Sequence, residues 1–193
     1  MAGALGRAGA VDLNADLYNA WLAEVQVSLY EGDIETAWER FCDGAESTRR
    51  SQLMRIQLMR IEVAELEARL ALARAAAGIE VRAMLALAAR RRKRLLAEKG
   101  ARRDAKALAA LLGAAHAHLS GGGRDGARPL LEEAVAGFEA SGRTLCAAAA
   151  RRRLGEVVGG EGGHRLIEKA EAWMRRQGIE RPEAITDLLA PGF

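Results

Sequence analysis

Two histidines and a cluster of glycines stand close together in residues 111–135, LLGAAHAHLSGGGRDGARPLLEEAV, and both residue types can do chemistry. Histidine is the commonest metal ligand among side chains. The glycines at 121, 123 and 126 have the G-x-G-x-x-G spacing of a dinucleotide-binding loop. A metal site needs further ligands beside the histidines, and a dinucleotide loop needs a strand before the glycines.

The surrounding sequence meets neither requirement. His116 and His118 would point about 200° apart on a helix, and no Asp, Glu or Cys follows four residues later. The residues before the glycines, ALAALLGAAHAHL, are typical of helix, and no Lys-Ser or Lys-Thr pair follows as a P-loop requires. We therefore interpret the stretch as a turn between two helices, with His116 packed in the core, and expect no metal and no cofactor.

Other reactive residue types also lack the partners that catalysis requires. Cys42 and Cys146 are about a hundred residues apart and are expected to be small buried thiols in a reducing compartment. Carboxylate pairs such as Glu132 and Glu133 are typical of solvated helix faces, and no G-x-S-x-G motif occurs. The sequence therefore predicts a protein that is not an enzyme, with a nucleotide-dependent regulator as the alternative.

The strongest charged feature is the segment 82–106, in which ten lysines and arginines stand against two carboxylates. It is either a solvated helix face or a surface for an acidic partner. Without aromatic residues for base stacking or a helix-turn-helix signal, an acidic protein segment is favoured over nucleic acid, which stays the alternative. The candidate partner-binding residues are Arg90, Arg91, Arg92, Lys93, Arg94, Arg102 and Arg103.

Five consecutive cations on one helix must point in all directions, because successive residues are about 100° apart. At least one must then face the neighbouring helices, where an unpaired guanidinium is costly to bury. We therefore expect one or two of the arginines in 90–94 to pair with Glu62, Glu65 or Glu67 of the preceding helix, while the others stay solvated.

The composition predicts an all-α fold. Half of the 193 residues are apolar and 28% are charged, which is typical of a globular protein. Alanine and leucine, both good helix formers, supply most of the apolar residues, and there are only three prolines. The longest nearly apolar run, 107–119, is too short to span a bilayer, and no signal peptide is recognised. We expect a cytoplasmic protein without membrane contact.

Glycines recur at steps of about forty residues and divide the chain into helix pairs. A period of this size with two helices per unit is typical of an α-solenoid. We expect a disordered segment 1–11 and a single tetratricopeptide-like domain over 12–193 with a short capping helix after Pro182. The expected pairs are 14–31 with 34–46, 51–77 with 79–99, 103–119 with 126–141, and 144–158 with 164–177.

Small and large residues recur inside these pairs at tetratricopeptide spacings. Asp33 stands where a helix N-cap is expected, within GDIETAWERF. The pair 51–99 shows no clear motif, and the step from Gly113 to Gly155 is 42 residues, longer than the ordinary repeat of about 34. The expected scaffold residues are Trp21, Ala37, Phe41, Leu112, Gly113, Leu154, Gly155 and Trp173.

Two long stretches resemble a known family. LYNAWLAEVQVSLYEGDIETAWERF, followed by SQLMRIQLMRIEVAELEARLALA, resembles the C-terminal helical region of large multidomain bacterial serine/threonine protein kinases. AAAARRRLGEVVGGEGGHRLIEKAEAWMRRQGIERPEAITDLLAPGF is similar to the extreme C-terminus of the same proteins. The glycine-rich loop, H-R-D and D-F-G of a kinase domain are missing, so no catalytic residue is carried over. The resemblance implies a regulatory or scaffolding module in kinase signalling. Its partner would be a kinase domain, an acidic peptide segment or a second copy of the chain.

Overall fold

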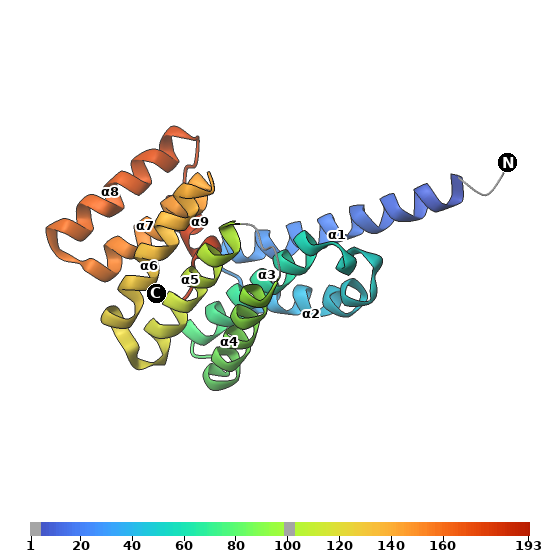
Figure 1. Ribbon diagram of the computed structural model, residues 1–193, viewed down its shortest axis with the longest axis horizontal. Coiled ribbons are helices and arrows are strands. Elements are labelled where there is room, and N and C mark those ends of the chain that lie inside the picture. The colour runs from blue at the N-terminus through green and yellow to red at the C-terminus, as the bar shows by residue number, and fades with distance from the viewer. Residues whose placement is uncertain (1–4, 99–102) are drawn as a thin grey trace. The chain divides into compact units, whose positions relative to one another are not determined.

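The computed structural model describes residues 5–98 and 103–193, and every regular element in these ranges is a helix (Figure 1). The all-α class predicted from composition is therefore confirmed. The α-helices are α1 (Leu5–Glu31), α2 (Ile34–Arg50), α3 (Gln57–Ala76), α4 (Val81–Ala97), α5 (Arg103–Ala117), α6 (Gly123–Ala140), α7 (Thr144–Val158), α8 (Gly160–Arg176) and α9 (Pro182–Leu189). A 3-10 helix, η1 (Gln52–Arg55), precedes α3, and a π-helical turn, η2 (His118–Gly122), precedes α6.

The helix boundaries follow the glycine pattern closely, with two differences. Gly32 and Gly142 end helices with φ of 82° and 72°, a left-handed backbone that glycine adopts without strain. The helix expected over 51–77 begins only at Gln57, because Ile56 takes an extended backbone after η1. Helix α1 begins at Leu5, inside the segment 1–11 that the sequence predicts to be disordered, and residues 1–4 lie outside the described ranges.

Backbone contacts divide the chain into two compact units, unit 1 (residues 1–60) and unit 2 (residues 61–193), where the sequence predicts one domain over 12–193. In unit 1, α1 packs against α2. The carboxylate of Asp33 caps α2 by accepting a hydrogen bond from the backbone N–H of Thr36 at 3.0 Å, as predicted. Phe41 is buried, and its ring centroid lies 5.4 Å from that of Trp21.

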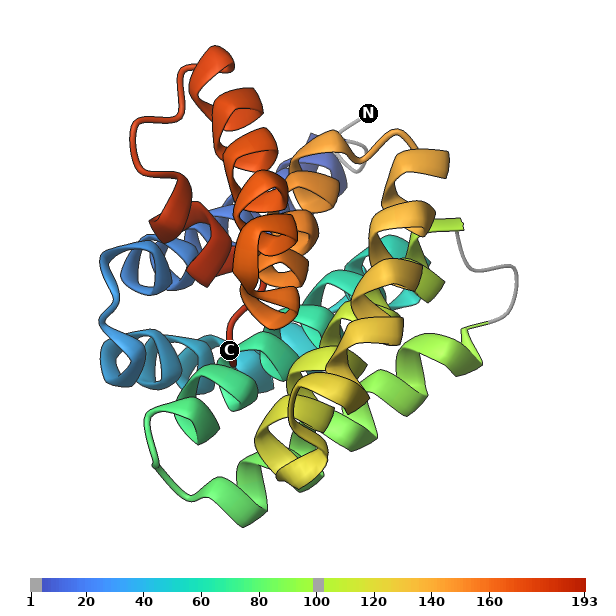
Figure 2. The same cartoon turned by 90° about the vertical axis from the view of Figure 1, so that its left-hand side faces the viewer.

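Unit 2 contains two kinds of helix, which alternate along the chain. Helices α3, α5 and α7, here called the inner helices, are buried over most of their residues. Helices α4, α6 and α8, here called the outer helices, bury a single stripe, as an amphipathic surface helix does. Neighbouring helices make hairpin-like contacts, α5 with α6, α6 with α7, and α7 with α8 (Figure 2).

Small residues allow these hairpins to close. A Cβ atom added to Gly155 on α7 would lie 2.6 Å from the carbonyl oxygen of Gly163 on α8. One added to Gly137 on α6 would lie 2.8 Å from the Cβ of Ala107 on α5. Helix backbones approach so closely only where one side chain is missing, and this explains the glycine of the pair Leu154-Gly155.

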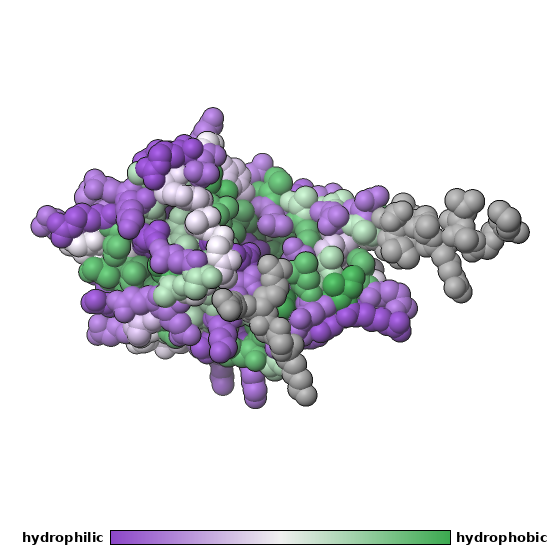
Figure 3. Space-filling view, turned by 45° about the horizontal axis from the view of Figure 1, so that its top comes forward, coloured by the Kyte–Doolittle hydropathy of each residue, from purple (hydrophilic) through white to green (hydrophobic). Residues whose placement is uncertain are grey.

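On the face drawn in Figure 3, hydrophilic residues predominate and hydrophobic residues appear between them in patches. Among the helices within residues 5–98 and 103–193, none combines the length and the apolar character that crossing a bilayer requires.

Candidate protein-binding surfaces

Two of the five cations in 90–94 are held by neighbouring helices. Arg91 on α4 donates from Nε and Nη2 to the two carboxylate oxygens of Glu67 on α3, at 2.6 and 2.9 Å. The predicted pairing with the preceding helix is therefore confirmed. Arg92 donates from Nε to the carbonyl oxygen of Ala109 on α5 at 2.9 Å. Its guanidinium lies over Gly113, where an added Cβ would be 2.7 Å from Nε, so this glycine makes room for an arginine.

The helix geometry explains which two are held. The residues of α4 that are buried are Met84, Ala88 and Leu95, which form one stripe. At about 100° per residue, Arg91 lies about 40° to one side of this stripe and Arg92 about 60° to the other. Both side chains therefore reach sideways to the flanking inner helices, one toward α3 and the other toward α5.

The other three cations form an exposed face. Arg90, Lys93 and Arg94 stand at positions i, i+3 and i+4 of α4, turned away from the buried stripe, and all three are exposed. No described carboxylate forms an ion pair with any of them. Of the remaining candidate residues, Arg102 lies outside the described ranges, and Arg103 is the first residue of α5. Arg90, Lys93 and Arg94 are hereafter called the basic face.

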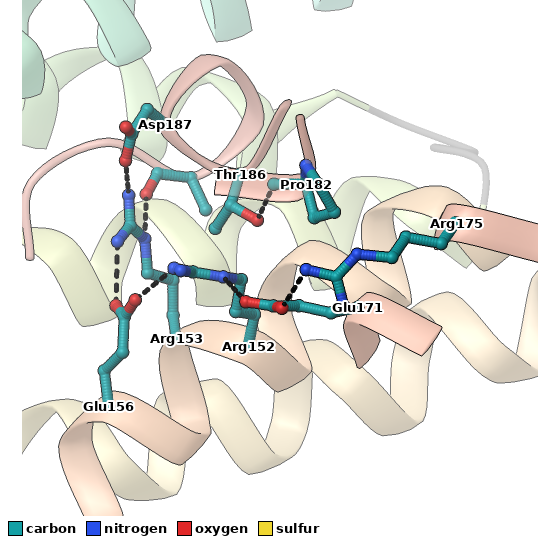
Figure 4. Close-up of polar contacts among 9 residues, drawn as sticks. Arg152, Arg153, Glu156, Glu171, Arg175, Pro182, Thr186 and Asp187 are labelled. Carbon is teal, nitrogen blue, oxygen red and sulfur yellow. Dashed lines mark hydrogen bonds and ion pairs between the residues drawn. The ribbon is translucent and has the colours of Figure 1, made fainter. Parts of the chain in front are cut away.

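A second arginine group, which the sequence analysis did not single out, lies on the inner helix α7. Arg153 is buried, and its guanidinium pairs with Glu156 on the same helix, with Nη1 2.7 Å from Oε2. It also pairs with Asp187 on α9 and donates from Nε to the carbonyl oxygen of Ala190 at 2.8 Å (Figure 4). A single buried side chain therefore fastens α9 and the residues after it to α7.

The neighbouring arginine extends this contact into a continuous network. Arg152 pairs with Glu156 and, at 3.1 Å, with Glu171 on α8, which Arg175 also contacts at 2.8 Å. Figure 4 shows the resulting path, in which cations and carboxylates alternate: Asp187, Arg153, Glu156, Arg152, Glu171 and Arg175. Three cations and three carboxylates leave no net charge, so this network joins helices and is not a surface for a charged partner.

The sequence spacing predicts only some of the ion pairs in this network. Glu156 stands three and four residues after Arg153 and Arg152, a spacing that predicts pairing on one helix. Asp187 is 34 residues away from Arg153, and nothing in its local sequence indicates the contact.

The two histidines of the opening stretch do not form a metal site. Residues Ser120 and Gly121 leave the helical backbone and make the turn between α5 and α6, as predicted. His116 is partly buried, and the ring of His118 lies 5.4 Å from that of Phe193. Within the described part of the chain, no group of three His, Cys, Asp or Glu side chains is placed to hold a metal ion.

The two cysteines lie in different surroundings. The prediction that both are buried is wrong for Cys42, which is exposed because it lies on the solvent side of α2. Cys146 is buried on α7, and burial raises the pKa of its thiol although Arg143 opposes the shift. A buried thiol with a raised pKa stays protonated near neutral pH, which does not suit a nucleophile.

Comparison with known proteins finds no matching protein family, no similar curated protein and no similar solved structure.

Proposed function

We propose that the chain is a non-catalytic helical-repeat module that binds an acidic protein segment through the basic face of α4. The tetratricopeptide-like solenoid is part of this proposal. It is supported by the alternation of inner and outer helices in unit 2 and by the glycines at the close contacts of α5 with α6 and of α7 with α8.

The observation that carries the proposal is the contrast within a single run of five cations. Arg91 and Arg92 are held by α3 and α5, whereas the basic face projects three positive charges from one side of a rigid helix. Charges fixed at i, i+3 and i+4 attract a segment of opposite charge and orient it along the helix. The absence of an aromatic residue in the run favours a protein segment over single-stranded nucleic acid.

Association with serine/threonine kinase signalling remains a prediction from the sequence resemblance alone. Under this proposal, the acidic segment would belong to a kinase domain or to another protein of the same signalling system.

The test compares the unaltered chain with a triple variant, Arg90→Gln, Lys93→Gln and Arg94→Gln. The probe is a fluorescein-labelled peptide of alternating glutamate and glycine, and binding is followed by fluorescence anisotropy. We expect binding by the triple variant to be about tenfold weaker at low salt, because three exposed charge contacts are each worth about 0.5 kcal/mol. The difference should shrink as salt rises, since exposed charges are screened over roughly 8 Å at physiological ionic strength.

A matched control removes the same number of positive charges from another outer helix. Arg165, Lys169 and Arg176 on α8 are exposed, and replacing them with glutamine lowers the net charge equally. Equal losses of affinity in both triple variants would mean that only net charge matters, which contradicts the proposal. Displacement of the peptide by a short single-stranded RNA at lower concentration than by unlabelled peptide would favour the nucleic-acid alternative.

A further inference from the structure

The last residues of unit 2, 187–193, are called here the C-terminal segment, and all of them except Asp187 are buried or partly buried. Arg69 on α3 donates from Nη1 to the carbonyl oxygen of Leu188 at 2.8 Å. Arg153 on α7 donates from Nε to the carbonyl oxygen of Ala190 at the same distance. Two buried guanidinium groups from different inner helices therefore bind backbone oxygens two residues apart, in the manner in which a protein binds a peptide.

The third inner helix contributes a close packing contact. A Cβ atom added to Gly192 would lie 3.1 Å from the Cβ of Ala115 on α5 and 3.2 Å from Cδ1 of Leu119 on η2. Gly192 also has a φ of +97°, which L side chains rarely adopt. The surface thus selects a residue without a side chain here, and the aromatic ring of Phe193 follows beside His118.

The two guanidinium groups keep a carboxylate partner when the C-terminal segment is absent. Nε of Arg69 lies 2.6 Å from Oε1 of Glu65 on the same helix. The two groups form an ion pair, although their geometry is not that of a hydrogen bond. Arg153 likewise retains Glu156. Release of the segment therefore does not leave either arginine as an unpaired buried cation, which would be strongly unfavourable.

The connection to the segment permits release. The linker 177–181 joins α8 to α9 through Gly178, whose φ is +81°, and four of its five residues are exposed. Helix α9 has eight residues and is too short to be stable alone. The carboxylate of Asp187, the side-chain partner of Arg153, is 63% exposed and thus open to water and salt.

The segment also leaves space beside it. A cavity of about 320 Å³ adjoins its last residue. The residues that line it are His118, Arg124, Arg153, Glu156, Val157 and Phe193. Apart from Phe193 these residues belong to η2, α6 and α7, so the surface beside Phe193 is not closed around the segment.

We propose that the inner face formed by α3, α5 and α7 is a peptide-binding site whose present ligand is the chain's own C-terminal segment, held in cis and releasable. When the segment leaves, the site accepts the C-terminal segment of a second copy. Its selectivity comes from an aspartate, two carbonyl oxygens, a glycine in left-handed conformation and the aromatic ring that follows this glycine. This site lies on different helices from the basic face of α4 and does not depend on the function proposed above.

The experiment uses the full chain with Gly192→Leu, which introduces both a clash with α5 and a strained backbone. The probe is a fluorescein-labelled peptide of residues 182–193, PEAITDLLAPGF. In the unaltered chain the tethered segment competes at an effective concentration of about a millimolar, so the probe binds weakly. We expect the variant to bind the probe at least about tenfold more tightly, with hydrogen exchange of residues 187–193 increased.

Two controls accompany the binding experiment with the Gly192→Leu variant. Gly142→Leu carries similar backbone strain at φ +72° with open space around it, and it should leave binding of the probe unchanged. A probe with lysine in place of Asp187 should bind the Gly192→Leu variant at least about tenfold more weakly, because it loses the pair with Arg153. Three results would overturn the proposal: unfolding of unit 2 in Gly192→Leu, unchanged exchange protection of the segment, or an opened segment without binding of the probe.

Discussion

The chain contains two runs of at least three consecutive arginines, one within 90–94 and one at 151–153, and their side chains have different roles. In the run 151–153 on the inner helix α7, each arginine pairs with a different neighbouring helix. Arg151 pairs with Glu139 on α6, and its two successors reach α8 and α9. In the run 90–94 on the outer helix α4, two arginines are held and three cations are exposed. The first run joins helices, whereas the second presents charge.

The difference arises from what surrounds each helix. Successive residues turn by about 100°, so any three consecutive arginines cover most of the helix circumference. Helix α7 has neighbours on several sides, and each of them brings a carboxylate within reach. Helix α4 buries one stripe of residues, and the residues on its opposite side are exposed. An arginine run therefore indicates a binding surface only where the helix that bears it is an outer one.

The largest expected effect follows removal of the best-connected arginine. Arg153→Met keeps most of the side-chain volume but removes the hydrogen bond to Ala190 and the pairs with Asp187 and Glu156. We expect the free energy of unfolding to fall by about 3 kcal/mol, because a buried carbonyl loses a charged donor and the ion network is cut. Urea denaturation followed by circular dichroism measures the change.

Arg153→Lys is the matched control, since it keeps the charge but loses the planar fork that binds several oxygens at once. It should lose about half as much stability as Arg153→Met. Equal stability of the methionine variant and the unaltered chain would show that the network contributes nothing and would remove the contrast between the two runs.

The next effect distinguishes the two glycines that lie beside these runs. At Gly155→Ala the new Cβ meets the backbone oxygen of Gly163 at 2.6 Å, so two helices must separate. At Gly113→Ala it meets the side chain of Arg92, which can move. We expect Gly155→Ala to lower the free energy of unfolding by about 2 kcal/mol and Gly113→Ala to lower it by less than about 1 kcal/mol, in the same denaturation measurement. A larger loss at Gly113 would mean that Arg92 is the more rigid partner.

Much of the fold could be predicted from the sequence because its signals are local. Glycines with positive φ mark the ends of α1 and α6, and Asp33 caps α2 through a residue three positions away. Long-range features could not be predicted in this way. The contact between Arg69 and Leu188 spans 119 residues, and the division near residue 60 depends on which helices pack together.

The candidate site shows the same limit. The pairing of Arg91 with the preceding helix could be predicted, because five consecutive cations cannot all avoid the helix interior. The roles of Arg69 and Arg153 could not, since short charged stretches look alike whether they face solvent or a buried segment. The apolar stripe of α4 was the available signal for which arginines are held, because positions on either side of a stripe reach sideways to neighbours.

The smallest expected effect separates the held from the exposed residues within the run 90–94 itself. Arg91→Gln removes the bidentate contact with Glu67, whose side chain is only 8% exposed, and should lower the free energy of unfolding by about 1.5 kcal/mol. Arg94→Gln changes an exposed residue and should alter stability by less than about 0.5 kcal/mol. For affinity toward the acidic peptide probe the order should reverse, because Arg94 is free to meet a ligand whereas Arg91 is occupied by Glu67. If both variants changed stability and affinity alike, the run would be one uniform solvated surface, and the distinction between structural and binding arginines on α4 would be lost.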